Sequence, residues 1–179
     1  MRYGFAQRIR EINQSEQCLS LAISFGYSDF MSLMTHPGAG WSIRHWRRED
    51  YPSIERIFKD CLKAFPWRGP ERDEIIRLRQ SLSANVAFVA VEKRAGVVGF
   101  LTLEQGKAYV PHVFVDEDWR FCGVGSGLLK VARGFVGRPL QLDVDVQNTA
   151  AIEAYTVLGW RERAKVGRGR NEQVRLIGP

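Results

Sequence analysis

The stretch VFVDEDWRFCGVGSGLL, residues 113–129, decides the fold class of this chain. It opens with apolar, β-branched residues that are typical of a strand. It then passes through a turn with glycines at 123, 125 and 127, and it ends in the apolar spacing of a helix. Glycines let backbone N–H groups approach an anion, and a helix start adds unpaired donors and a partial positive charge. The stretch therefore predicts a strand–loop–helix unit that binds a pyrophosphate.

Two common phosphate-binding loops do not fit these residues. A P-loop requires Gly-Lys-Ser/Thr, but Gly127 is followed by Leu128. A dinucleotide fingerprint that starts at Gly123 would require a glycine where Leu128 stands. The loop also follows several predicted strands and no βαβ repeat. Both alternatives are therefore excluded.

The residues before the loop alternate between helix and strand patterns. Asp50 is a predicted N-cap, and an apolar stripe from Ile54 to Phe65 predicts the helix that follows it. A second helix is predicted to begin at Glu71, with acidic residues in its first turn, where the helix dipole favours negative charge. The predicted helices cover residues 51–65 and 71–82, and the predicted strands cover residues 41–45, 86–92, 97–103 and 108–115.

The residues after the loop continue in the same way. A helix is predicted from Gly123 or Val124 to Val136, and residues 141–146 alternate as a half-exposed strand does. Asn148 opens a further helix, which Gly159 closes. Two short strands are expected before Ile177.

The first 40 residues have a different pattern. Phe5, Ile9 and Ile12 follow an interrupted helical spacing, and HPGAG, residues 36–40, is typical of a linker. We expect a helical N-terminal arm and linker over residues 1–40 and one domain over residues 41–179. The arm is expected to pack on the domain or on a second subunit.

Composition limits the class of protein. The chain has 179 residues, of which 45% are hydrophobic and 26% charged, as in a globular soluble protein. The longest apolar run, residues 86–91, is far shorter than the roughly 18 residues that a membrane span needs. No signal peptide, CxxC pair or histidine ligand spacing is visible, so we expect a cytoplasmic protein without disulfides or a metal.

Two motifs together resemble the GNAT family of acyl-CoA N-acyltransferases. RFCGVG, residues 120–125, is similar to the family's pyrophosphate loop Arg/Gln-x-x-Gly-x-Gly/Ala. NTAAIEAYTVLGW, residues 148–160, is similar to its asparagine and Ala-rich helix ending in Tyr-x-x-x-Gly and an aromatic residue. The resemblance runs from Trp41 to the C-terminus, and Phe121 stands where the family usually has glycine. It implies an α/β (α+β) fold with a mixed, mostly antiparallel sheet of about six to seven strands and helices on both faces.

The resemblance also implies a cosubstrate, acetyl-CoA. Its pantetheine arm would pair with the strand Val113, Phe114 and Val115, and Asn148 would contact the same arm. Backbone amides near Val115 could polarise the thioester carbonyl. The residues expected at the pyrophosphate are Arg120, Phe121, Cys122, Gly123, Val124, Gly125 and Ser126.

The reaction implied is direct attack of a neutral primary amine on the thioester. Tyr155 occupies the family's position for the acid that protonates the leaving thiolate, although its spacing also suits a packing residue. Asp143, Glu104, Tyr109 or an ordered water could accept the amine's proton. Cys122 is an alternative nucleophile, but no histidine partner for it is evident.

Phe65, Trp67 and Tyr109 are expected on the acceptor side. The acceptor's identity stays open between a small molecule and a protein, and a homodimer is possible. A non-catalytic module that binds CoA is the alternative function. The net charge of +6 admits nucleic acid, but the neutral arm argues against it, and no membrane partner is expected.

Overall fold

The computed structural model of the chain describes residues 33–36, 38–169 and 172–179. Most of the predicted helical arm, residues 1–32, lies outside these described residues. None of the helices in the described part is long and apolar enough to span a membrane.

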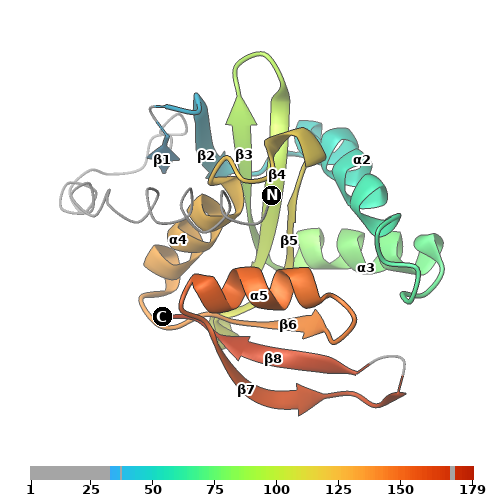
Figure 1. The fold of residues 1–179 in the computed structure, drawn as a ribbon. Coiled ribbons are helices and arrows are strands. Elements are labelled where there is room, and N and C mark those ends of the chain that lie inside the picture. Colours follow the sequence, from blue (N-terminus) through green and yellow to red (C-terminus); the bar gives the residue numbers. More distant parts are fainter. Residues whose placement is uncertain (1–32, 37, 170–171) are drawn as a thin grey trace, which may run out of the picture. The chain divides into compact units, whose positions relative to one another are not determined.

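One sheet of eight strands organises the described residues, in the order β1-β2-β3-β4-β5-β6-β8-β7 (Figure 1). All neighbouring strands are antiparallel except β5 and β6, which are parallel. The predicted α/β fold with a mixed, mostly antiparallel sheet is thereby confirmed. The strands are β1 (Met34–Thr35), β2 (Trp41–His45), β3 (Val86–Glu92), β4 (Gly96–Glu104), β5 (Tyr109–Val115), β6 (Gln141–Asp145), β7 (Arg161–Val166) and β8 (Gln173–Ile177).

The eighth strand, β1, comes from the segment predicted as arm and linker. Met34 pairs with Ile43, and Thr35 pairs with Ser42. In the turn between these strands the backbone N–H of Ala39 donates to His36 Nδ1 over 2.9 Å. The sheet therefore begins before the predicted boundary at residue 41.

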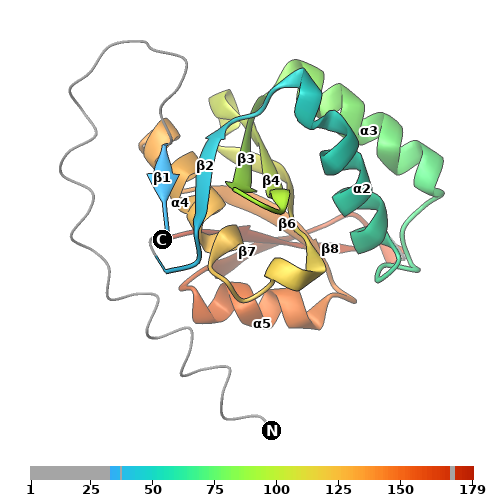
Figure 2. The same ribbon diagram turned by 90° about the horizontal axis from the view of Figure 1, so that it is seen from above.

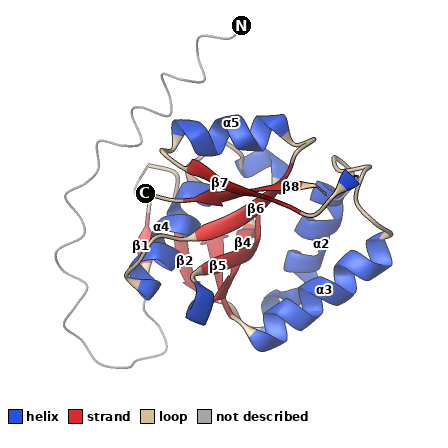
Figure 3. Ribbon diagram, turned by 90° about the horizontal axis from the view of Figure 1, so that it is seen from below, coloured by secondary structure: helices blue, strands red, loops and turns tan. Residues whose placement is uncertain are grey.

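Helices cover both faces of the sheet (Figure 2). The long helices are α2 (Tyr51–Leu62), α3 (Glu71–Ala84), α4 (Val124–Val136) and α5 (Thr149–Val157). α2 and α3 share an apolar core with β3 and β4, while α4 and α5 pack into a second core on the other face, with α5 beside the C-terminal strands (Figure 3). Asp50 precedes α2 as predicted, but its carboxylate does not cap the helix; it binds Arg44 and the backbone N–H of Arg47 instead.

The strands β5 and β6 touch at one end and then diverge (Figure 1). Their single register pair is Tyr109 with Gln141. On the other side of β5, the N–H of Asp116 donates to the carbonyl of Val98 over 2.9 Å. Because peptide groups alternate along an antiparallel strand, the N–H and C=O groups of Val113 and Val115 point away from β4, toward the diverging β6. The sheet therefore presents a free strand edge in its middle.

Candidate active site

The glycine-rich loop joins this strand edge to the start of α4. Gly123 is the N-cap of α4, with φ of 76°, and the first helical hydrogen bond runs from the N–H of Gly127 to the carbonyl of Gly123. The N–H groups of Val124, Gly125 and Ser126 thus have no acceptor within the helix, and no side chain caps them. The helix dipole adds a partial positive charge there, so this turn suits a phosphate anion.

Phe121 in this loop has a backbone conformation that favours glycine. Its φ is 66°, in the left-handed region, and its side chain is 70% exposed. The loop thus keeps a glycine-type backbone at the position where the motif departs from the family pattern.

The buried side chain of Trp41 packs against the loop and hydrogen-bonds to it, and the sequence did not indicate this role. The indole N–H donates to the carbonyl of Cys122 over 2.9 Å. The ring is fully buried and lies against Gly127. Since Trp41 is distant in sequence from the loop, the glycine at 127 was the one local signal of this close packing.

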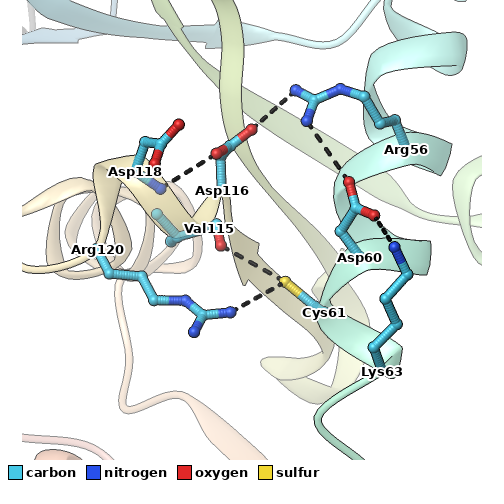
Figure 4. Close-up of polar contacts among 8 residues, drawn as sticks. All are labelled: Arg56, Asp60, Cys61, Lys63, Val115, Asp116, Asp118 and Arg120. Carbon is cyan, nitrogen blue, oxygen red and sulfur yellow. Dashed lines mark hydrogen bonds and ion pairs between the residues drawn. The ribbon is translucent and has the colours of Figure 1, made fainter.

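Arg120 turns toward α2 (Figure 4). Its Nη2 lies 3.7 Å from Cys61 Sγ, and the thiol in turn donates to the carbonyl of Val115 over 3.5 Å. Burial raises the pKa of Cys61, so this thiol remains protonated and can act as a donor. The Arg120 side chain is 40% exposed, and its Nη1 lies 4.0 Å from Glu117 Oε1.

Ion pairs fasten α2 to the same loop (Figure 4). Arg56 Nη2 lies 2.8 Å from Asp116 Oδ2, at the point where β5 ends. Asp60 extends the cluster to Arg56 and Lys63, and Asp116 Oδ1 accepts the backbone N–H of Asp118. The loop is therefore held between α2 and α4.

Asn148 directly precedes α5, and Tyr155 lies on this helix. The Oδ1 of Asn148 accepts the backbone N–H of Ala151 over 3.3 Å, which makes it the predicted cap. The ring of Tyr155 packs 5.2 Å from that of Trp160. Burial raises the pKa of Tyr155, so its phenol stays protonated at neutral pH. None of the described residues hydrogen-bonds its hydroxyl.

A cavity of about 680 Å³ lies beside the divergence of β5 and β6. It brings together four residues predicted from the sequence: Trp67, Glu104, Tyr109 and Asp143. Phe65 is not part of its lining and packs instead on Trp67 and Phe114. The lining also contains Arg68, from the same predicted acceptor-side segment as Trp67, and His112, Asp145 and Gln173, which the sequence did not point to.

Both candidate carboxylates are paired with cations. The two carboxylate oxygens of Asp143 accept hydrogen bonds from Nε and Nη2 of Arg175, each over 2.8 Å. The Tyr109 hydroxyl donates to the same carboxylate over 3.1 Å. Burial and the charge of Asp143 raise the pKa of Tyr109, which therefore remains a donor. Glu104 binds Lys107 over 2.7 Å, and that lysine side chain is 77% exposed. Among the described residues, no three His, Cys, Asp or Glu side chains gather as metal ligands do.

Asp145 connects the acceptor-side loop to the sheet. It accepts hydrogen bonds from Arg68 over 2.7 Å, from Trp67 over 3.1 Å and from Gln173 over 2.8 Å. Burial works to raise the pKa of Asp145, but the hydrogen bond and charge of Arg68 outweigh it and keep the pKa below its usual value. Trp67 therefore lines the cavity in a fixed position.

His112 is the half-buried histidine of this cavity. Its Nδ1 lies 2.9 Å from Thr102 Oγ1. Burial, together with the positive charge of Arg68, lowers the pKa of His112 to about 4, so the ring is neutral near pH 7. A single histidine within a strand pattern does not reveal from the sequence that its ring is partly buried and lies near the charge of Arg68.

Comparison with known proteins agrees with this geometry. The solution structure of apo-form YjaB from Escherichia coli is 27% identical, with a TM-score of 0.65, and the match covers 78% of this chain and 99% of that chain. Two further structures have the same fold. The ribosomal-protein-S18-alanine N-acetyltransferase from Escherichia coli is 19% identical, with a TM-score of 0.58 and coverage of 78% of this chain and 93% of that chain. The ribosomal-protein-alanine N-acetyltransferase from Brucella melitensis is 20% identical, with a TM-score of 0.54 and coverage of 75% and 97%.

A model of the Acetyltransferase (GNAT) family matches residues 41–160, which contain the strand edge, the glycine-rich loop and Tyr155. The chain therefore belongs to the GNAT family of acetyltransferases, whose enzymes use acetyl-CoA as cosubstrate.

Proposed function

We propose that this protein is an N-acetyltransferase that transfers the acetyl group of acetyl-CoA to a primary amine by direct attack. One observation carries the proposal: the edge of β5 that β6 leaves unpaired is followed, after the loop of residues 116–123, by the uncapped first turn of α4. An extended amide-containing arm that ends in a pyrophosphate matches this succession of an open strand edge and an anion site.

The residues on this path fit the cosubstrate. The outward-facing peptide groups of Val113 and the N–H of Val115 can pair with the amides of the pantetheine arm, as a further strand would, while the carbonyl of Val115 already accepts the Cys61 thiol. The N–H groups of the α4 first turn face a pyrophosphate, and Arg120 is exposed enough to reach it. Asn148, at the start of α5, is proposed to contact the arm from the other strand.

Tyr155 is proposed as the acid that protonates the departing thiolate. Burial raises the pKa of Tyr155, so the phenol carries its proton at neutral pH and has one to donate as the C–S bond breaks. The packing against Trp160 fixes the ring without occupying the hydroxyl.

The amine is proposed to enter the cavity between Trp67 and Tyr109. Its proton must be lost, because an ammonium has no lone pair for the attack. Glu104 is the better candidate for this base than Asp143. The partner of Glu104 is one exposed lysine, whereas Arg175 and Tyr109 occupy both oxygens of Asp143.

The proposal is tested by the release of free CoA with a panel of amines, for the wild-type protein and Tyr155→Phe. We expect a loss of kcat of about 100-fold in the variant with an unchanged Kd for acetyl-CoA, since general acids contribute roughly 10²–10⁴-fold. Tyr51→Phe, at the first residue of α2 and outside the cavity lining, is the matched control and should keep its activity.

Thermal shifts with acetyl-CoA, NAD and ATP complete the test. Stabilisation by acetyl-CoA alone supports the cosubstrate assignment. Binding of acetyl-CoA without turnover on any amine would favour the CoA-binding module instead, and no stabilisation by acetyl-CoA would remove the assignment of the loop.

A further inference from the structure

We propose that His112 is a neutral hydrogen-bond donor, whose Nε2–H stabilises the carbonyl oxygen of the reacting thioester. The inference rests on the proposed acetyl transfer and adds a catalytic residue to it. It follows from a chain of hydrogen bonds that leads from α3 through β4 to the ring.

The chain contains three side-chain contacts. Asn85 Nδ2 lies 3.1 Å from Ser81 Oγ, Ser81 Oγ lies 3.0 Å from Thr102 Oγ1, and Thr102 Oγ1 lies 2.9 Å from His112 Nδ1. Ser81 and Thr102 are buried. Thr102 is fully buried, so its hydroxyl proton needs a partner within the protein, because a buried donor without one is destabilising.

One direction of donation satisfies every group in this chain. An amide nitrogen such as that of Asn85 only donates, so Ser81 Oγ accepts a hydrogen bond from it and donates its own hydroxyl proton in a hydrogen bond to Thr102. The hydroxyl of Thr102 then donates a hydrogen bond to Nδ1 of His112. In the reverse direction, the hydroxyl proton of Ser81 would have no acceptor among the described residues.

The neutral ring of His112 consequently carries its proton on Nε2. A neutral imidazole has one donor and one acceptor nitrogen, and Nδ1 is the acceptor here. Burial and the charge of Arg68 disfavour a second proton. His112 therefore offers a hydrogen bond and cannot act as the base for the amine through Nε2.

The Nε2–H is open to the cavity. In the described part of the chain, Nη1 of Arg133 is the one fully buried side-chain nitrogen or oxygen without a hydrogen-bond partner. Nε2 of His112 has no partner there either, so it is accessible on a ring that lines the cavity. His112 also directly precedes Val113, the first residue of the proposed pantetheine edge.

This donor matches the charge changes of the reaction. When the lone pair of the amine forms the new N–C bond, the C=O π pair moves onto oxygen, where His112 donates its hydrogen bond. The pair then returns, the C–S bond breaks with its electrons on sulfur, and Tyr155 protonates the sulfur. The proton of the attacking nitrogen leaves to the base. A fixed neutral donor at such an oxygen is worth roughly 10²–10³-fold in rate.

Two substitutions distinguish a donor from a base. His112→Gln supplies an oxygen that can accept from Thr102 and an N–H that can replace Nε2–H, whereas His112→Leu supplies neither. We expect kcat to fall less than tenfold in His112→Gln and about 100-fold or more in His112→Leu, with the acceptor KM nearly unchanged in both. His45→Leu, on β2 and outside the cavity, is the control.

A second measurement does not depend on turnover. The ¹⁵N chemical shifts of His112 in the ligand-free protein should report a protonated Nε2 and an unprotonated Nδ1 at pH 7, and in His112→Leu the Kd for acetyl-CoA should change far less than kcat.

Each contrary result has a separate meaning. An Nδ1–H tautomer, equal losses of kcat in His112→Gln and His112→Leu, or a loss confined to the acceptor KM would overturn the inference. Absence of transfer by the wild-type protein with every amine would instead contradict the proposed function.

Discussion

Trp41 and Gly127 are in such close contact that the glycine has no room for a side chain. A Cβ built at Gly127 would lie 2.5 Å from Cη2 of Trp41. The same indole donates to the carbonyl of Cys122, so one buried ring fixes both the loop and the helix that follows it. The position of the first turn of α4, the proposed pyrophosphate site, thus depends on a residue at the start of β2.

Gly127→Ala should destabilise the protein by about 1–3 kcal/mol, because an added methyl group overpacks this core and displaces α4. The affinity for acetyl-CoA should fall with it. Urea unfolding and calorimetric titration measure the two effects.

Gly134→Ala is the matched control for this change. It lies on the same helix with nothing within 4 Å of its Cβ position, and it should stabilise the protein by about 1 kcal/mol through helix propensity. Equal effects of the two substitutions would contradict the role of the Trp41 contact.

At position 121, a glycine should give a more stable protein than an alanine, which is the reverse of the usual order. A left-handed backbone costs an L-residue roughly 1–2 kcal/mol, while the freedom of glycine in the unfolded chain costs about 0.5–1 kcal/mol. We therefore expect Phe121→Gly to be more stable than Phe121→Ala by up to about 1 kcal/mol in chemical denaturation.

The same pair of substitutions at Phe135 should give the opposite order. Phe135 is an exposed residue in the last turn of α4, where glycine is still less favourable than alanine. If alanine is also the more stable choice at position 121, the left-handed conformation there is not retained.

Local patterns were sufficient for most of the fold. The strands at residues 41–45 and 86–92 begin and end where their apolar pattern predicts, and the glycine-rich loop lies between the predicted strand and helix. β1 was missed because a strand of two residues has no periodicity and exists through its pairing with β2.

The electrostatics of the cavity could not be predicted from local patterns. Asp143 meets Arg175 because the register of β6 and β8 places them opposite one another. Asp145 meets Arg68 because the loop after α2 reaches over β6. Such pairs depend on three-dimensional register and loop position, so the sequence could nominate Asp143 as a base without revealing its partner.

The low pKa of His112 predicts a loss of stability in mild acid. Above pH 6.5 the histidine is neutral in both the folded and the unfolded chain. Between about pH 4 and 6.5 the unfolded chain binds a proton that the folded chain does not, so the free energy of unfolding decreases as the pH falls. At 1.36 kcal/mol for each pH unit, the loss reaches about 2 kcal/mol by pH 5 and about 3 kcal/mol at pH 4.

His112→Gln should remove this component, because glutamine does not titrate. Urea unfolding of both proteins between pH 7.5 and 4.5 should show that the free energy of unfolding depends less on pH in the variant. The difference in stability between the wild-type protein and the variant should therefore change in favour of the variant as the pH falls. The other ionisable groups that line the cavity are Arg68, Glu74, Arg77, Glu104, Tyr109, Asp143 and Asp145. They are present in both proteins, so their contributions cancel in the comparison to the extent that they do not interact with the histidine. Parallel stability curves for the two proteins would show that His112 titrates normally in the folded chain, and they would also withdraw support for a permanently neutral donor in the cavity.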